Sequence, residues 1–246
     1  MSSDLRTFYS DRYAQKDTTR LRSRAFKQAE HKRIARELIY GSGAPVGDGA
    51  RILDIGSGGS FYLDGVSGDR FSLDLALRPL DGAEIGIQGS ADALPFADLS
   101  FDTIVVSQVL EHVPDWLGVL AEISRTLRPG GRLVLTVPNR YALMRRRFHM
   151  VERLIDLSGH LHEFREAQLI FALRSQGLDV VSSQGACYDV FWLCAMLERS
   201  RYAWIGCAVL DRVGPDRIEQ LMRLESVIRR HRLRGLSLEI IATRDS

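Results

Sequence analysis

An aspartate before a turn of small residues, and a second aspartate farther along, are the first features that could do chemistry. Asp54 precedes the turn at residues 56–60 (Gly-Ser-Gly-Gly-Ser), and Asp74 follows about 20 residues after Asp54. Glycines let a backbone turn tightly and approach a ligand, because no Cβ stands in the way. A carboxylate about 20 residues beyond such a turn can accept hydrogen bonds from ribose hydroxyls. The pair predicts a ligand that contains a nucleoside.

Phe61 argues against one class of such ligands, the nicotinamide dinucleotides. The dinucleotide fingerprint is Gly-x-Gly-x-x-Gly, and Phe61 stands at the position of its third glycine. A bulky ring there would block the close packing of strand and helix that this glycine permits. A nicotinamide-dependent oxidoreductase is therefore kept only as a remote alternative.

Strands that alternate with helices must position these residues. Short apolar runs predict strands at residues 51–55, 71–74, 84–88, 101–106, 132–137, 178–182 and 236–243. Amphipathic or short apolar stretches predict helices at residues 19–40, 61–66, 115–127 and 164–176. This alternation indicates βαβ units and a mostly parallel sheet. Because such sheets bind ligands beyond the carboxyl ends of their strands, we expect the functional residues just after each strand.

Four segments, in the right order, resemble the motifs of class I methyltransferases that use S-adenosylmethionine (SAM). The resemblance is to the large type 11 subgroup, which includes enzymes of ubiquinone and menaquinone biosynthesis. The matching segments are residues 54–58, 91–96 with 100–102, 107–115 and 127–133. The match is tight over residues 50–138 and loose over residues 160–182. Ser60 departs from the pattern, because it replaces the last glycine of the first motif.

The resemblance implies a Rossmann-like α/β fold. Its sheet would have seven strands, mostly parallel, with an antiparallel last strand. We expect one methyltransferase domain over residues 1–246, with helical cap insertions. Its parts would be an N-terminal helical cap at residues 1–45, a SAM-binding core at 50–138, and acceptor-side insertions at 139–175 and 186–233.

The resemblance also implies which residues bind SAM and its product, S-adenosylhomocysteine. Asp54 would face the ammonium group and Asp92 the adenine amino group, since carboxylates accept from such donors. The aromatic segment with Tyr9 and Tyr13 would close over the cofactor. The full expected set is Asp54, Gly56, Ser57 and Gly58 at the methionine part, Asp74, Leu75, Asp92 and Ala93 at the ribose and adenine, and Ser107 and Gln108 near the sulfonium.

His112 and His162 are the candidate catalytic residues. Methyl transfer is an in-line displacement, so the protein must align the acceptor and remove a proton from a hydroxyl or amine. The subgroup keeps a histidine near the pocket after the fourth strand, where His112 stands. His160 and His162 precede the sixth strand and could overhang the site. A packing or capping role stays open for each of them.

We expect no metal ion. Some quinone O-methyltransferases of this type bind magnesium through Glu-x-x-Glu-His, and the matching residues here are Gln108, Glu111 and His112. A neutral glutamine at the first position weakens the attraction for a hard cation. The three cysteines, at positions 187, 194 and 207, lack the CxxC spacing of a zinc site and indicate no disulfide framework.

Composition narrows the partners. The net charge is only +2, and no nucleic-acid-binding motif occurs, which argues against nucleic acid as a partner. An acidic middle third between basic flanks could favour an anionic acceptor. The sequence has neither a secretory leader nor a transmembrane segment, which predicts a cytoplasmic protein. The apolar stretch at residues 186–210, with the arginines at 145–147, could dock a lipid-linked acceptor or contact a membrane peripherally. It could equally form a pocket wall or a dimer contact, so both monomer and homodimer stay open.

The sequence thus predicts a SAM-dependent methyltransferase that acts on a small-molecule acceptor. O-, N- and C-methylation stay open, and so does the acceptor, for which an apolar, lipid-linked or natural-product intermediate is considered. The alternative is a SAM-binding regulatory or scaffold subunit without catalysis, which Ser60 and Gln108 suggest as departures from the pattern. The complete set of cofactor carboxylates argues against that alternative.

Overall fold

The computed structural model describes residues 38–58, 61–77, 80–81, 83–138, 160–186 and 237–245, together with Thr7. Several predictions therefore lie outside the described residues. They concern Tyr9 and Tyr13, the three cysteines, nearly all of the helix at residues 19–40, and the insertion at 186–233 beyond its first residue.

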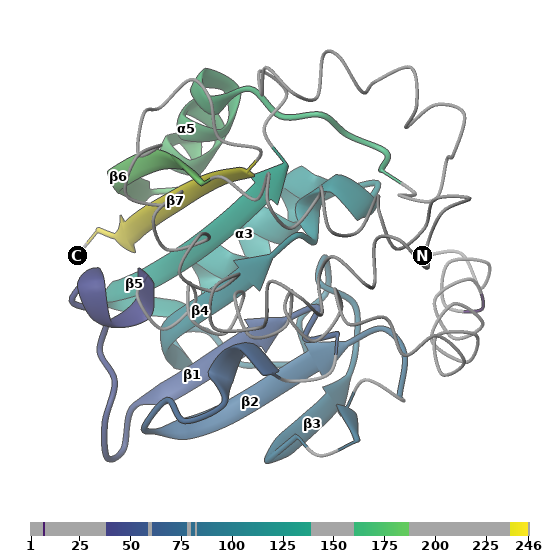
Figure 1. Cartoon of the computed structure of the whole chain (residues 1–246), viewed down its shortest axis with the longest axis vertical. Helices are drawn as coiled ribbons and strands as arrows, with labels where there is room; N and C mark the ends of the chain where they lie inside the picture. Colours follow the sequence, from purple (N-terminus) through teal and green to yellow (C-terminus); the bar gives the residue numbers. More distant parts are fainter. Residues whose placement is uncertain are drawn as a thin grey trace, which may run out of the picture.

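Seven strands form one sheet in the order β3-β2-β1-β4-β5-β7-β6 (Figure 1). Strands β1 to β5 run parallel, and β7 is antiparallel to both of its neighbours, β5 and β6. The predicted Rossmann-like fold, with its antiparallel last strand, is confirmed. The strands are β1 (Arg51–Ile55), β2 (Asp69–Asp74), β3 (Ile85–Gln88), β4 (Phe101–Ser107), β5 (Leu127–Pro138), β6 (Leu178–Ala186) and β7 (Ser237–Arg244).

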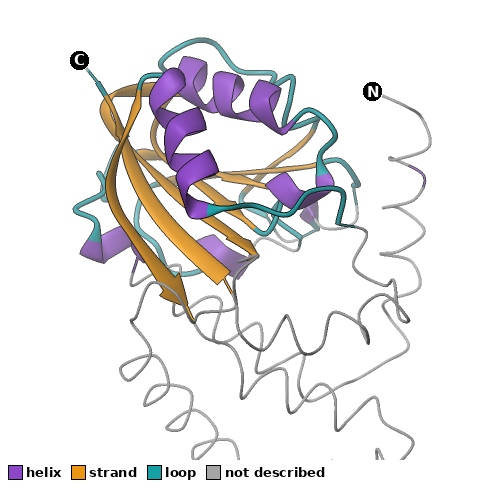
Figure 2. Cartoon of the chain, turned by 90° about the horizontal axis from the view of Figure 1, so that it is seen from above, coloured by secondary structure: helices purple, strands orange, loops and turns teal. Residues whose placement is uncertain are grey.

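Apolar residues on both faces of the sheet build two cores. One face carries the larger core, against which helices α3 (Trp116–Thr126) and α5 (Glu166–Ser175) pack (Figure 2). The other face packs against the segment around Leu38, Ile39 and Ala44. Burial on both faces explains why the central strands are apolar runs rather than alternating ones.

Side chains at both ends of α3 fix where it starts and stops. The Asp115 carboxylate accepts from the Gly118 N–H at 2.9 Å, as an N-cap should. At the other end, Arg244 of β7 donates to the Ser124, Arg125 and Leu127 carbonyls. These carbonyls lack helical partners, so a cation there stabilises the terminus. These hydrogen bonds connect the end of α3 to strand β7.

Two predicted elements differ from the structure. The helix predicted at residues 61–66 is wrong, because η2 (Phe61–Leu63) is a single 3₁₀ turn. Gly65 follows it with a φ of 69°, which ends the turn. The fifth strand starts at Leu127 rather than Arg132, because Leu127 already pairs with Phe101 before a register shift. In addition, α5 packs on the core, although it lies inside the predicted insertion at 139–175.

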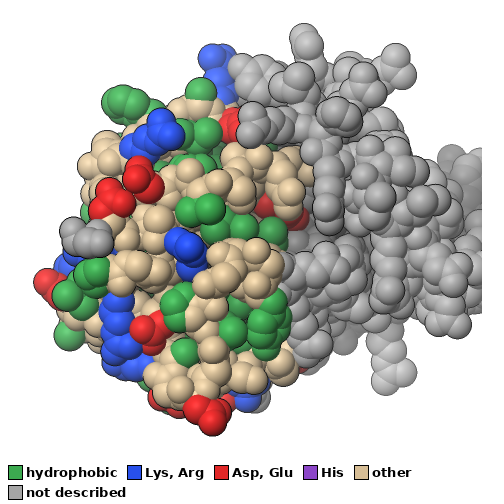
Figure 3. Space-filling view, turned by 90° about the vertical axis from the view of Figure 1, so that its left-hand side faces the viewer, with side chains coloured by type: hydrophobic (Ala, Val, Ile, Leu, Met, Phe, Trp, Pro, Cys, Tyr) green, Lys and Arg blue, Asp and Glu red, His purple; other side chains and the backbone are tan. Residues whose placement is uncertain are grey.

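The face on the left-hand side of Figure 1 has an ordinary solvated surface. Arginine, aspartate and glutamate side chains are interspersed there among apolar ones (Figure 3). Mixed charge of this kind is typical of a soluble protein's outer surface rather than of a ligand site. The predicted cofactor residues lie instead at the carboxyl edge of the sheet, where parallel βαβ folds bind ligands.

Candidate functional site

The glycine turn lies between the ends of β2 and β4. Gly56 and Gly58 have φ values of 70° and 55°, which residues with a Cβ rarely adopt. The Gly56 and Ser57 N–H groups donate to the Leu73 carbonyl at 2.7 and 3.1 Å. A Cβ on Gly56 would lie 2.4 Å from a methyl carbon of Val109. Glycine is therefore required at position 56 by both backbone conformation and space.

Asp54 and Ser57 place buried polar atoms inside this turn. Both side chains are fully buried, and neither the Asp54 carboxylate oxygens nor the Ser57 hydroxyl has a hydrogen-bond partner among the described residues. Burial, and then the nearby Asp74 carboxylate, raises the pKa of Asp54 well above its ordinary value. A buried acceptor without a donor costs about 1–3 kcal/mol. A ligand that brings a cation or N–H donors to this point would recover that cost.

Asp74 holds the ends of two loops together. One of its carboxylate oxygens accepts from the Gly58 N–H and the other from the Ala76 N–H, both at 3.0 Å. These two bonds fix the orientation of a carboxylate, a group that accepts hydrogen bonds from hydroxyls. Leu75, which the sequence predicts against adenine, is half-buried beside this carboxylate. Its carbonyl accepts from the Gln88 side chain at 3.0 Å.

Asp92 and Ala93 lie in a tight turn after β3. The Ser90 hydroxyl donates to one carboxylate oxygen of Asp92. The Ala93 N–H, predicted to donate to the adenine ring, instead donates to the Ser90 carbonyl at 3.2 Å. A bond from Ala93 to a ligand would therefore have to share or replace this turn bond.

The end of β4 is held by a residue that the sequence does not single out, Thr136 of β5. Its hydroxyl lies 2.9 Å from the Ser107 hydroxyl and 3.4 Å from the Gln108 side-chain nitrogen. Its carbonyl accepts from the Gln108 N–H at 2.9 Å. Gln108 has a φ of 56°, an uncommon conformation that costs about 1–3 kcal/mol and clusters at functional sites. The two predicted floor residues are thus fixed by one threonine.

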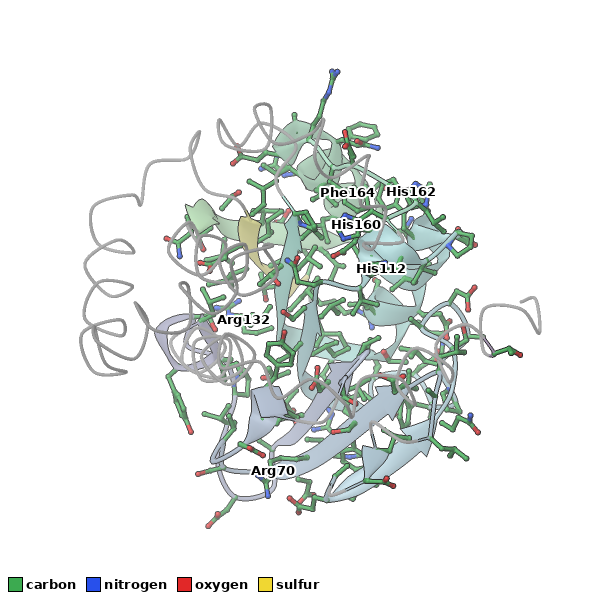
Figure 4. All side chains as sticks on the ribbon, turned by 45° about the vertical axis from the view of Figure 1, so that its right-hand side comes forward. Arg70, His112, Arg132, His160, His162 and Phe164 are labelled. Carbon is green, nitrogen blue, oxygen red and sulfur yellow. The ribbon has the colours of Figure 1, made fainter. Side chains whose placement is uncertain are left out.

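His112 and His160 come together (Figure 4). A carboxylate oxygen of the buried Glu111 lies within 4.8 Å of a nitrogen of each ring. The turn η4 (Leu110–His112) places the His112 Nε2 3.9 Å from a carboxylate oxygen of Glu111. The centroids of the two imidazole rings lie 4.8 Å apart. The Glu111 carbonyl accepts the N–H groups of Leu161 and His162 at 2.7 and 3.2 Å, which fixes the second histidine segment over the first.

His162 has a different environment from the other two histidines. Its Nε2 lies 3.0 and 3.2 Å from the backbone carbonyls of Val113 and Pro114, so this nitrogen carries a proton and donates. Its ring also packs beside Phe164. Such contacts favour a role for His162 in holding the loop after η4, rather than in accepting a proton.

A comparison with known proteins names the family. A family model described as a methyltransferase domain matches residues 11–183, more than half of the chain. The chain belongs to that family: it is a class I SAM-dependent methyltransferase. The SAM-binding segments predicted at residues 54–58, 74–75, 91–96 and 107–115 all lie within the matched span.

Relatives and solved structures agree with this identification. The ubiquinone biosynthesis O-methyltransferase of Xylella fastidiosa (strain 9a5c) is 30% identical over 182 residues, which cover 65% of this chain and 74% of that protein. Phosphoethanolamine N-methyltransferase 2 of Haemonchus contortus, solved with S-adenosylhomocysteine, has a TM-score of 0.60 and 14% identity, over 88% of this chain and 53% of that one. A SAM-dependent methyltransferase of Archaeoglobus fulgidus has a TM-score of 0.56 and 18% identity, over 87% and 94% of the two chains. The structural likeness shows the fold, and the Xylella relative bears out the resemblance to ubiquinone enzymes.

A row of polar residues crosses the methyltransferase sheet from the end of β4. Ser107, Thr136, Glu239 and Gln184 pair in register across β4, β5, β7 and β6. Glu239 is only 5% exposed and accepts from the Gln184 side chain at 2.8 Å. With about 4.8 Å between strands, the row is roughly 15 Å long. The sequence carries no signal for this row, because the pairing of its residues appears only in the folded sheet.

Glu111 and His112, two residues of the predicted metal motif, form a group with His160, which the motif did not include. Each offers one ligand atom, and these atoms all lie within 4.8 Å of one another. Gln108, the residue that weakens the magnesium motif, is not part of this group. A carboxylate and two imidazoles are ligand types that divalent transition metals accept.

In the described ranges, no helix has both the length and the hydropathy to cross a membrane.

Proposed function

We propose that this methyltransferase binds SAM in the loops after β1, β2 and β3 and methylates a hydroxyl or amine of a small molecule. The observation that carries the proposal is the buried Asp54 carboxylate, which has no donor among the described residues. It lies near the end of β1, just before the glycine turn and close to Asp74. The name of the Xylella relative, an O-methyltransferase of ubiquinone biosynthesis, supports a small-molecule acceptor.

Asp54 and Ser57 fit the methionine end of SAM. An ammonium group near the Asp54 carboxylate would supply both positive charge and N–H donors to oxygens that lack them. The carboxylate would then ionise in place, because an opposite charge within a few ångströms favours the charged form. The fully buried Ser57 hydroxyl can donate to an anionic group, such as the cofactor's own carboxylate.

Asp74 and Asp92 fit the adenosine end. The Asp74 carboxylate is oriented by the Gly58 and Ala76 N–H groups, and a carboxylate is a suitable acceptor for ribose hydroxyls. One Asp92 oxygen accepts from Ser90, which leaves the other to accept from the adenine amino group. Leu75 adds a half-buried apolar surface beside the ring.

His112 is the group that we assign to proton removal. Bound SAM supplies an electrophilic methyl group on a sulfonium centre, so the protein has only to align the acceptor and take its proton. His112 is partly exposed, with 18% of its side chain accessible, and its Nε2 faces the buried Glu111 carboxylate at 3.9 Å. A nearby carboxylate stabilises the imidazolium that forms when His112 accepts the proton.

Gln108 and Thr136 would line the space between the cofactor and the acceptor. The strained backbone of Gln108 is fixed by the Thr136 carbonyl, and its side chain lies near the Thr136 hydroxyl. The polar row continues from Thr136 to the buried Glu239. An acceptor that carries hydroxyl or amine groups would find hydrogen-bond partners along this row.

Calorimetry of cofactor binding tests the proposal before the acceptor is known. We expect the wild-type protein to bind both SAM and S-adenosylhomocysteine, while NADH produces no heat. A panel of phenols, quinol precursors, amino sugars and natural-product intermediates then identifies the acceptor by SAM turnover. Binding of NADH without binding of SAM would refute the assignment of the loops.

A further inference from the structure

The loop from β3 to β4 carries Asp92 but gets its shape from elsewhere. Residues 89–100 contain one isolated bridge, between Ser90 and Ala93, and no helix or strand. Leu99 has a φ of 53°, an uncommon backbone conformation for a leucine. A loop like this needs outside contacts to hold one carboxylate in place, and α3 provides them.

Arg125 of α3 uses all of its donors in this contact. A guanidinium has five N–H donors in a rigid plane. The guanidinium of Arg125 donates five hydrogen bonds of 2.8–3.1 Å. Two go to the Glu122 carboxylate, and one goes to the carboxylate of Asp98. The other two go to the carbonyls of Leu94 and Phe96.

Glu122 completes the contact from one turn earlier on the same helix face. Its carboxylate accepts the Leu94 N–H at 2.7 Å as well as two bonds from Arg125. Leu94 therefore has both its N–H and its carbonyl held by α3, two residues after Asp92. The hydrogen bond from Arg125 lowers the pKa of Glu122, which keeps this carboxylate ionised at neutral pH.

We propose that Glu122 and Arg125 form a clamp that positions Asp92 for recognition of the adenine amino group. This inference rests on the proposed function, in which Asp92 accepts from that group. A loop held before the ligand arrives loses less conformational entropy on binding. Arg125 is thus a positioning residue: it sets the selectivity of the cofactor site for adenine through the backbone of Leu94 and Phe96.

Arg128 offers a matched control on the same side of the fold. It forms a comparable, partly exposed ion pair, with Asp102 at 2.6 Å, and it donates to the Leu99 carbonyl at 3.1 Å. It has no hydrogen bond to residues 92–96 among those found for the described residues. Removing Arg128 therefore costs an ion pair of the same type without opening the clamp.

The test compares S-adenosylhomocysteine with S-inosylhomocysteine, in which a carbonyl oxygen replaces the 6-amino group. Calorimetry measures both dissociation constants for wild type, Arg125→Gln, Arg125→Lys and Arg128→Gln, after circular dichroism shows that each variant is folded. Wild type and Arg128→Gln should prefer the adenosyl compound by roughly tenfold or more, the value of a charge-assisted hydrogen bond. Arg125→Gln should lower the preference to about threefold or less. Arg125→Lys should not restore it, because an ammonium lacks the planar fork.

Asp92→Asn links the clamp to its target. In the wild-type background it should remove most of the adenine preference, whereas in the Arg125→Gln background it should change little further. An unchanged preference in folded Arg125→Gln, or an equal loss in Arg128→Gln, would overturn the clamp. Should Arg125→Gln not fold, Glu122→Gln, which weakens the hold on Leu94, decides by the same ratio. Failure of wild type to bind S-adenosylhomocysteine would instead refute the proposed function.

Discussion

The two halves of the ligand edge hold different kinds of chemistry. After β1 and β2, the methyltransferase has carboxylates: Asp54 is buried without a donor among the described residues, and Asp74 is oriented by two backbone N–H groups. After β4, it has imidazoles instead, with His112 and His160 in contact beside the buried Glu111. We call these the cofactor half and the transfer half.

We therefore expect cofactor affinity and turnover rate to depend on separate residues. The carboxylates of the cofactor half are suited to the ammonium, hydroxyl and amino groups that SAM and its product both carry. The imidazoles of the transfer half are suited to moving a proton in the transition state. Changes in the first half should alter affinity, whereas changes in the second should alter turnover.

The largest expected effect is in the transfer half. Once an acceptor is known, His112→Ala should lower kcat by roughly 10²–10⁴-fold, because the acceptor's proton loses its base. The dissociation constant of S-adenosylhomocysteine should stay within about twofold of wild type. Steady-state turnover assays give kcat, and calorimetry on the same preparation gives the dissociation constant.

His162→Ala is the control for that variant, since its Nε2 is occupied by the Val113 and Pro114 carbonyls. It should lower kcat by much less than His112→Ala. Equal kcat values for His112→Ala and wild type would show that another group acts as the base.

Treatment with EDTA should leave wild-type turnover unchanged. A loss of turnover that Zn²⁺ or Mg²⁺ restores would give Glu111, His112 and His160 a metal-binding role instead.

The next effect is in the cofactor half, and it has opposite signs for binding and stability. Asp54→Asn should weaken SAM binding by roughly 10–100-fold, because the ammonium loses its charged partner. The same change should raise the thermal unfolding temperature of the ligand-free protein. Because the pKa of Asp54 is higher folded than unfolded, Asp54 contributes less stability as the pH rises through its folded pKa. The gain in Asp54→Asn should therefore be larger at higher pH than at lower pH in calorimetric scans.

A smaller effect on affinity is expected at the ribose. Asp74→Ala should weaken both SAM and S-adenosylhomocysteine by more than about 1.5 kcal/mol, or over tenfold. The loss should be equal for the two ligands, because they share the ribose. Equal affinities in wild type and variant would show that Asp74 serves only the Gly58 and Ala76 loops.

Much of the cofactor half could be predicted from the sequence, whereas much of the transfer half could not. The glycine turn, Asp54 and Asp74 are close in sequence to strands that apolar runs reveal, so their placement follows from the parallel sheet. The contact of His112 with His160 depends on residues 48 positions apart, joined by the Glu111 carbonyl. Thr136 and Glu239 lie on strands far apart in the sequence, and only strand register brings them together. The helix predicted at residues 61–66 is the short turn η2 instead, and Gly65 follows that turn. The sequence does not show how tertiary packing limits this segment to one turn.

The most direct test is whether SAM binding releases a proton from Asp54. The pKa of this carboxyl is raised by burial, and an ammonium beside it would lower that pKa again, so binding should expel the proton. Calorimetric titrations from pH 5 to 7, in buffers of different ionisation heat, measure this release while the ammonium of SAM, with a pKa of about 7.7–8.0, stays mostly protonated. We expect affinity to rise with pH and SAM binding to release protons, with both effects absent in Asp54→Asn. Tight binding that is independent of pH, with no proton exchanged and no difference in Asp54→Asn, would contradict the role of Asp54.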